Sequence, residues 1–254
     1  MLEILPLFIL GSIIGSFLNV CIYRLPLNLS IWKPGSFCPH CKKPITLWNN
    51  IPILSYLLLK GKCAHCKNSI SVQYILVEVL TGTVTVLSYE YYALSNMFII
   101  YSVFMYFLIV IGFIDLKTHL IYNRVLVSLL LFAILAQTVS PFTQWQNALL
   151  GMLTGGGVML LVSLLGKALL KKESLGMGDV KLAAVAGFFL GWQNILIAAY
   201  TGFVFALITM LMINSIKRTW IVGYIPLGPF LALGIITFIF WGKDMVQIYL
   251  SLVI

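Results

Sequence analysis

The sequence predicts an all-α polytopic membrane protein with about eight transmembrane helices and one small cytoplasmic insert. Three observations predict this class. Of 254 residues, 61% are hydrophobic and only 9% are charged, whereas soluble domains carry roughly a quarter charged residues. The apolar runs are long enough for helices that cross a bilayer. Only residues 24–71 break this composition, and they hold four of the five cysteines.

The apolar runs place the predicted spans in order along the chain. The first run carries Glu3, has no basic n-region and lacks a clear cleavage site, so we expect a retained helix and not a signal peptide. A tight turn around Trp192 and Gln193 joins the short sixth span to the seventh. We divide the chain into a first transmembrane helix (1–23), an insert (24–71) and a transmembrane core (72–254). The predicted spans are about 2–23, 72–92, 97–116, 120–140, 147–170, 179–192, 194–213 and 221–241.

The basic residues predict the orientation in the membrane. Net charge is +9, and of the 16 Lys and Arg residues only Lys243 falls on the second side of this arrangement. Such asymmetry marks the basic side as cytoplasmic, and eight spans then place both termini outside. Because topology explains the charge, we expect a lipid bilayer and no nucleic acid as partner. The acid Glu173 lies in one of the same loops. The basic residues on the cytoplasmic side are Arg24, Lys33, Lys42, Lys43, Lys60, Lys62, Lys67, Lys117, Arg124, Lys167, Lys171, Lys172, Lys181, Lys217 and Arg218.

The insert holds two C-x-x-C pairs among turn-forming residues. They read CPHC, with Cys38 and Cys41, and CAHC, with Cys63 and Cys66. An insert of this size cannot bury an adequate hydrophobic core by itself. Two such pairs are typical of a tetrahedral site in which four thiolates bind Zn²⁺. We therefore predict an insert stapled by structural zinc, because four protein ligands leave no open position for catalysis.

Redox chemistry is the alternative interpretation of the cysteine pairs. A membrane thiol oxidoreductase needs its thiols on the oxidising side of the membrane. The charge distribution instead places the insert in the reducing cytoplasm, which favours zinc. The fifth cysteine, Cys21, lies in the first span and is expected to be a small buried hydrophobic residue.

Two aspartates are predicted at the cytoplasmic ends of different helices. Asp115 ends the third span in FIDLKTHLIYN, and Asp179 precedes the sixth in GMGDVKL. A carboxylate at membrane depth is costly and therefore indicates function. Two facing carboxyl groups can share a proton, so that one accepts a proton from water while the other polarises a peptide carbonyl. We predict this pair as catalytic and assign neither role to one residue.

Neighbours of the second aspartate are candidates for support of the catalytic loop. Gly176 and Gly178 lack Cβ atoms, so that a peptide backbone can approach the acid and the loop can take unusual dihedral angles. Lys181 follows in the same motif and completes this supporting set.

The aspartates also have other interpretations. Asp179 can serve as a helix N-cap, and Asp115 as an interface residue paired with Lys117 or Arg124. A proton-coupled transporter would use both acids as proton carriers. That function gives no reason for an insert with four cysteines.

Several motifs then follow in a recognisable order. GSFLNVCIYRLP precedes the two cysteine pairs, which are separated by NNIPILSYLLLKGKC. YILVEVLTG, FIDLKTHLIYN, GMGDVKL and YIPLGPFLALG follow. In this order they resemble the bacterial prepilin leader peptidases, membrane aspartic proteases with a G-x-G-D motif. The resemblance runs the length of the chain.

The resemblance implies a bifunctional enzyme of the bacterial cytoplasmic (inner) membrane. Such enzymes cut the basic leader from type IV prepilins or pseudopilins on the cytoplasmic side, in pilus assembly and protein secretion. Many then methylate the new N-terminal amine with S-adenosylmethionine, and the cysteine-bearing insert is usual in those members. Motif matching gives Asp115 and Asp179 the protease role. Glu78 matches a motif near the methyltransferase region, where it either positions the substrate amine or its methylation site, or is a buried polar packing residue.

Overall fold

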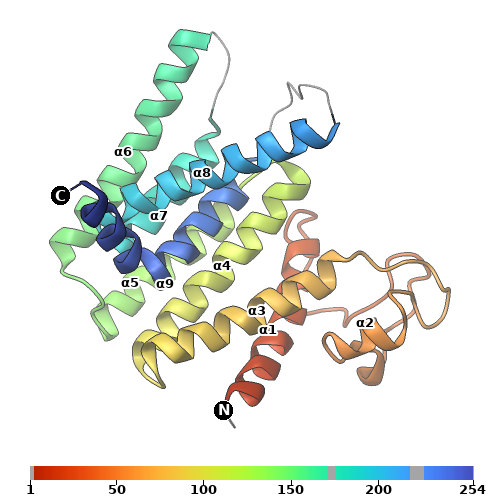
Figure 1. Ribbon diagram of the computed structural model, residues 1–254. Helices are drawn as coiled ribbons and strands as arrows, with labels where there is room; N and C mark the ends of the chain where they lie inside the picture. Colours follow the sequence, from red (N-terminus) through yellow and green to blue (C-terminus); the bar gives the residue numbers. More distant parts are fainter. Residues whose placement is uncertain (1–2, 171–174, 218–225, 254) are drawn as a thin grey trace. The chain divides into compact units, whose positions relative to one another are not determined.

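The computed structural model describes residues 3–170, 175–217 and 226–253 (Figure 1). Lys171, Lys172, Glu173 and Arg218, which entered the prediction of sidedness, lie outside these residues, as does the start of the predicted eighth span. The described residues form helices and no β-strand, which confirms the all-α class. The chain divides into two compact units, Met1–Val110 and Ile111–Ile254.

The first unit is built on two packed helices, α1 (Ile4–Arg24) and α3 (Gln73–Tyr92). Glycines allow their backbones to approach closely, because a Cβ atom at Gly15 would lie 2.8 Å from Cα of Glu78. The first part of α4 (Asn96–Thr118) also belongs to this unit, where the hydroxyl groups of Thr85 and Tyr106 lie 2.7 Å apart.

The insert between α1 and α3 contains little regular structure (Figure 1). It has one 3-10 turn, η1 (Leu47–Asn50), and one short helix, α2 (Leu54–Leu58), both between the two cysteine pairs. Arg24 organises its beginning, because this buried guanidinium donates hydrogen bonds to the carbonyl oxygens of Ser30, Pro34 and Gly35. Arg24 is therefore a structural residue of the insert as well as a basic residue at the end of a span.

In the described residues of the second unit, the end of α4 is followed by five helices. Helix α7 lies among the others and contacts α5, α6, α8 and α9. Its contact with α6 is direct, since Cβ atoms at Gly151 and Gly155 would collide with the backbone of α7 at Gly187 and Ala183. The five helices are α5 (Asn123–Val139), α6 (Trp145–Leu170), α7 (Met177–Leu190), α8 (Trp192–Lys217) and α9 (Gly228–Val253).

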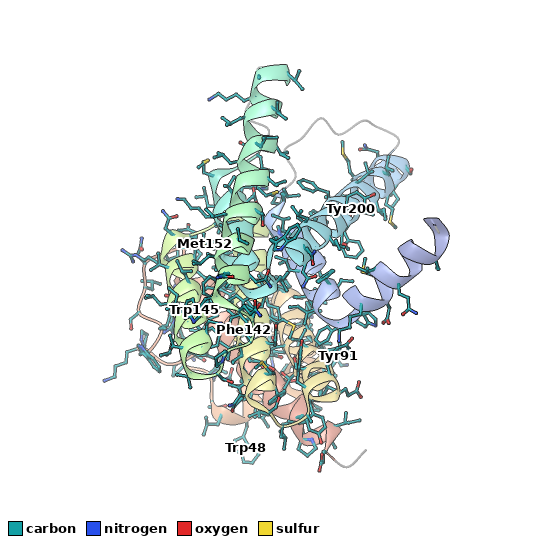
Figure 2. All side chains as sticks on the ribbon, turned by 90° about the vertical axis from the view of Figure 1, so that its left-hand side faces the viewer. Trp48, Tyr91, Phe142, Trp145, Met152 and Tyr200 are labelled. Carbon is teal, nitrogen blue, oxygen red and sulfur yellow. The ribbon has the colours of Figure 1, made fainter. Side chains whose placement is uncertain are left out.

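Aromatic side chains close the end of α7 that is remote from Asp179. The rings of Phe142 and Phe189 stack with centroids 5.3 Å apart, and Trp145 meets Phe188 edge to face at 6.0 Å. Figure 2 shows Phe142 and Trp145 next to each other near the start of α6. This cluster, together with the glycine contact, fixes how α7 lies on α6.

Every predicted span corresponds to a helix, and five of the described helices are long and apolar enough to cross a membrane: α1, α4, α6, α8 and α9. That α3, α5 and α7 also cross stays a prediction. Helix α7 has only 14 residues, which is about 21 Å at 1.5 Å per residue, against a hydrocarbon core of about 30 Å.

The predicted end of the last span is wrong, and the predicted tight turn is present one residue earlier than expected. The last helix continues to Val253 and does not end near 241, because exposed Lys243 and Asp244 lie on the surface of a continuing helix and do not interrupt it. The turn between the sixth and seventh spans is the single residue Gly191, with φ +81°, and Trp192 already belongs to α8. A backbone at this φ favours glycine.

Candidate functional site

Two aspartates from different helices lie together in the second unit. Asp115 is in the last turn of α4, and Asp179 is in the first turn of α7. Their side chains are only 5% and 4% exposed, and the carboxyl group of Asp115 is close enough to act electrostatically on that of Asp179. The structure thus brings together the two acids that the sequence analysis selected, and it places both at helix ends.

A helix N-terminus holds one oxygen of Asp115. The backbone N–H of Gly228, the first residue of α9, donates a hydrogen bond to Oδ2 of Asp115 at 3.1 Å. The first N–H groups of a helix have no partner within the helix and carry the positive end of its dipole. They therefore stabilise negative charge on this carboxyl group. A Cβ atom at position 228 would lie 2.6 Å from the same oxygen, so only glycine allows this approach.

Ile121, in the segment between α4 and α5, lies beside the starts of α7 and α9. A Cβ atom at Gly178 would be 2.8 Å from Cβ of Ile121, and one at Gly228 would be 3.2 Å from its Cδ1. The side chain therefore fills the space between the starts of α7 and α9. It provides an apolar wall next to the carboxyl groups, where a low dielectric strengthens their interaction.

Asp179 keeps one oxygen free of hydrogen bonds within the described residues. Its Oδ1 is buried and has no partner there. Leaving a buried polar atom unsatisfied costs about 1–3 kcal/mol, so such an atom calls for an explanation. A proton shared with a neighbouring carboxyl group, or a bound water molecule, would satisfy it, and both belong to the chemistry of a carboxyl pair.

The supporting residues differ in part from expectation. Gly176, and not Asp179, is the N-cap of α7. Its φ of −73° and ψ of 143° are open to any residue, and Gly178 is helical, so the expected unusual dihedral angles are absent at both glycines. Gly178 instead makes room for the side chain of Ile121. Lys181 is exposed, and its Nζ donates to Oδ1 of Asn123 at 2.9 Å, which ties α7 to the start of α5.

The four cysteines of the insert converge on one point. The sulfur atoms of Cys38, Cys41, Cys63 and Cys66 all lie within 4.8 Å of one another, and Sγ of Cys38 is 3.8 Å from Sγ of Cys66. Tetrahedral zinc with bonds of 2.3 Å separates its sulfur ligands by about 3.8 Å. A disulfide requires about 2.05 Å, and all four thiols are free. The residues present therefore fit a closed zinc site.

Two equivalent turns present these thiols. In the first turn, the N–H of Cys38 bonds to the carbonyl of Lys43 at 3.0 Å. In the second, the N–H of Cys63 bonds to the carbonyl of Asn68 at 2.8 Å. The backbone N–H groups of Cys66 and His65 lower the pKa of the Cys63 thiol to about 6. These amides therefore favour the thiolate form, which is the form that binds metal.

Glu78 connects α3 with the insert. This buried carboxyl group accepts a hydrogen bond from the backbone N–H of Ile53 at 2.8 Å. Ile53 precedes α2 and has φ +63°, which is strained for a β-branched residue. One turn earlier in α3, the carbonyl of Tyr74 accepts a hydrogen bond from Asn19 of α1 at 2.9 Å. Glu78 is thus placed to hold the loop between the cysteine pairs.

Sequence reasoning missed Gly228 and Ile121. Gly228 lies in the quoted motif YIPLGPFLALG, where glycine followed by proline is a signal for a helix start. That signal locates the helix but does not reveal which acid its first amide meets, because the partner is far away in sequence. Ile121 carries no signal that distinguishes it from other apolar residues.

Comparison with known proteins identifies two matching family models. Residues 9–92 match the bacterial peptidase A24 N-terminal domain, and residues 102–213 match the type IV leader peptidase family. The first match contains the four cysteines and Glu78, and the second contains both aspartates. No solved structure matches the chain.

Curated relatives match over most of their length. A prepilin leader peptidase/N-methyltransferase from Pectobacterium carotovorum subsp. carotovorum is 35% identical, covering 89% of this chain and 88% of that protein. Proteins of the same name from Neisseria gonorrhoeae and Bacillus subtilis (strain 168) are similar too. They are 34% and 33% identical, and the matches cover 82% and 97% of this chain.

Proposed function

Because the chain belongs to the type IV leader peptidase family, we propose that it cleaves the basic leader peptide of type IV prepilins or pseudopilins. The single observation that carries this proposal is the buried pair Asp115 and Asp179, contributed by two helix ends. Relatives are named for a second activity, and we include N-methylation of the new N-terminus in the proposal.

Hydrolysis by this pair needs one carboxylate and one carboxylic acid. The carboxylate removes a proton from a water molecule, whose oxygen attacks the scissile peptide carbonyl. The carboxylic acid donates a hydrogen bond to that carbonyl oxygen and supports the charge that develops on it. The C–N bond then breaks as the leaving amine receives the proton that the first carboxyl group took from the water. The N–H of Gly228 stabilises charge on Asp115 during this cycle.

The location of the pair suits a substrate with an apolar helix and a basic leader. Both acids lie at helix ends, where a membrane surface supplies water that the hydrocarbon core lacks. The positive-inside rule places the surface with Arg124 and Lys181 in the cytoplasm. Cleavage therefore takes place at the cytoplasmic face of the bacterial inner membrane, and the insert lies on that same side.

Zinc has a structural role in this account. Cys38, Cys41, Cys63 and Cys66 hold it, and four thiolates leave no position for water or substrate. The ion supplies the stabilisation that a small insert cannot obtain from a hydrophobic core. Convergence of all four sulfurs on one point supports this role over a thiol oxidoreductase, whose two cysteine pairs act as separate dithiols.

Glu78 serves methylation through the insert and does not touch the substrate. Its carboxylate is engaged by the amide of Ile53, so that it holds the loop between the cysteine pairs against α3. S-adenosylmethionine supplies the methyl group when it is bound.

A single assay tests the proposal. Purified enzyme is incubated with a prepilin, with and without S-adenosylmethionine, and the product is weighed by mass spectrometry. The expected products are the mature pilin without cofactor and its monomethylated form with cofactor. An uncleaved prepilin in both samples contradicts the peptidase proposal, whereas cleavage without a mass increase contradicts only the methylation.

A further inference from the structure

The insert exposes apolar side chains where a water-soluble domain would bury them. Helix α2 buries Ser55 and exposes Leu54, Leu57 and Leu58, which share one face at helical spacing. Leu58 is 82% exposed. Burying such a side chain is worth about 1.5–3 kcal/mol, so an outward leucine stripe on a short helix indicates an apolar environment outside the protein.

The neighbouring turn continues this surface. Leu47 and Trp48 of η1 are 87% and 82% exposed, and η1 contacts α2. Figure 2 shows Trp48 pointing away from the ribbon. We call the set Leu47, Trp48, Leu54, Leu57 and Leu58 the insert tip. A contiguous apolar surface of this kind marks an interaction site.

The charge around the insert tip is of one sign. Residues 24–71 contain no Asp or Glu. Exposed tryptophan next to lysine is typical of segments that lie at a membrane surface, where lysines meet anionic headgroups. The six lysines of this stretch are all exposed, namely Lys33, Lys42, Lys43, Lys60, Lys62 and Lys67.

A further contact places the insert next to a membrane helix. The ring of Trp32 in the insert lies 6.3 Å from that of Phe17 in α1, between centroids. Both side chains are exposed, and Phe17 lies about two turns before the end of α1 at Arg24. Since α1 is long and apolar enough to cross a membrane, the insert folds back along the outer surface of a span and does not project away from it.

We propose that the insert tip docks on an anionic bilayer surface, with its leucines and Trp48 in the headgroup region and the lysines at the lipid phosphates. Trp32, which contacts Phe17 of α1, adds a second exposed aromatic residue of the insert beside a candidate span. This docking fixes the zinc-bearing insert at the level of the membrane surface, independently of the reaction that the protein catalyses.

The first test measures lipid contact of Trp48 in the full chain. Wild type and Trp48→Phe are reconstituted in nanodiscs of phosphatidylethanolamine and phosphatidylglycerol, with or without bromine on the upper acyl chain. The difference in emission between the two proteins isolates Trp48, and we expect it to be quenched by bromine and less so in phosphatidylcholine alone. Trp241→Phe is the positive control, because Trp241 is an exposed residue of the candidate span α9.

The second test removes the stripe without adding charge. Leu57→Gln/Leu58→Gln is expected to lose the bromine quenching of Trp48 while keeping the zinc content of wild type. Leu94→Gln is the matched control, because Leu94 is 74% exposed but lies in the loop after α3, remote in sequence from the insert. Its Trp48 quenching should remain at the wild-type level.

Two results would overturn the docking proposal. One is Trp48 emission that is insensitive to brominated lipid and open to an aqueous quencher such as iodide. The other is Trp48 that becomes protected from iodide only when prepilin is added, which would make the insert tip a protein-binding surface.

Discussion

The backbone N–H of Gly228 donates a hydrogen bond to Oδ2 of Asp115 at 3.1 Å. This bond joins the end of α4 to the start of α9, and it directs the positive end of a helix dipole at one acid of the pair. Asp179, in the first turn of α7, also lies at a helix N-terminus, but its Oδ1 is buried without a hydrogen-bond partner among the described residues. The two carboxyl groups therefore have different environments, as two groups that share one proton require.

Gly228→Ala should impair cleavage strongly without unfolding the protein. The new methyl group would lie 2.6 Å from Oδ2 of Asp115 and displace the carboxyl group. Misplacing a catalytic group by about 1 Å can cost about 10²-fold in rate, which a prepilin cleavage assay would detect. Gly157→Ala is the matched control, because nothing lies within 4 Å of its Cβ position. Equal activity of the two variants would contradict the role assigned to Gly228.

Glu78 can be tested by the difference between Gln and Ala. Glutamine still accepts the hydrogen bond from Ile53, so Glu78→Gln should retain most methylation, whereas Glu78→Ala should lose it. Leaving the N–H of Ile53 without a partner costs about 1–3 kcal/mol, and only Glu78→Ala has this cost. The measurement is the rate of methylation of a pre-cleaved pilin at saturating S-adenosylmethionine.

Variants of Ile53 provide the control for that series. Ile53→Gly keeps the N–H and accepts φ +63° without strain, so methylation should persist. Ile53→Pro removes the N–H and excludes this φ, so it should behave like Glu78→Ala. If Glu78→Gln were as inactive as Glu78→Ala, the carboxylate itself would be needed and the positioning role would be wrong.

Loss of zinc should affect methylation more than cleavage. Cys38→Ser/Cys63→Ser removes two of the four converging thiols, and the insert then loses the ion that replaces a core. The aspartates lie in the other compact unit. Metal analysis should show loss of zinc in this variant and none in Cys21→Ala, because Cys21 is not one of the converging thiols. Full zinc content in the double variant would refute the proposed ligation.

Lys181→Met should reduce cleavage only a few-fold. Its hydrogen bond to Asn123 is exposed, and exposed polar contacts of this kind contribute about 1 kcal/mol or less. Steady-state cleavage kinetics provide the measurement, with Asn123→Ala as the variant that removes the same bond from the other side. A loss as large as that of an aspartate variant would mean that Lys181 takes part in the chemistry.

Hydropathy predicts the helices, and the spacing of the motifs predicts which functional residues lie together in the structure. Long apolar runs can satisfy their backbone only as helices, so the order of elements followed directly. Two C-x-x-C pairs can bring their thiols together in only a few arrangements, and the four sulfur atoms do converge. Gly151 and Gly155 of α6 lie against the backbone of α7, as small residues at a helix interface allow.

Contacts between distant segments could not be predicted in the same way. Nothing in the residues around Asp115 indicates that Gly228 approaches it, nor does the motif around Glu78 indicate Ile53. These pairs depend on how whole helices and the insert pack. Charge was also a poor guide to the end of α9, because Lys243 and Asp244 remain on a helix that continues past them.

The central claim is that Asp115 and Asp179 together hydrolyse the leader peptide bond. The most direct measurement is mass spectrometry of prepilin after incubation with Asp115→Asn and with Asp179→Asn, each inserted in membranes at the level of wild type. An amide cannot exchange a proton as a carboxyl group does, so neither variant should release the mature pilin. Release of mature pilin at the wild-type rate by either variant would remove that residue from the mechanism.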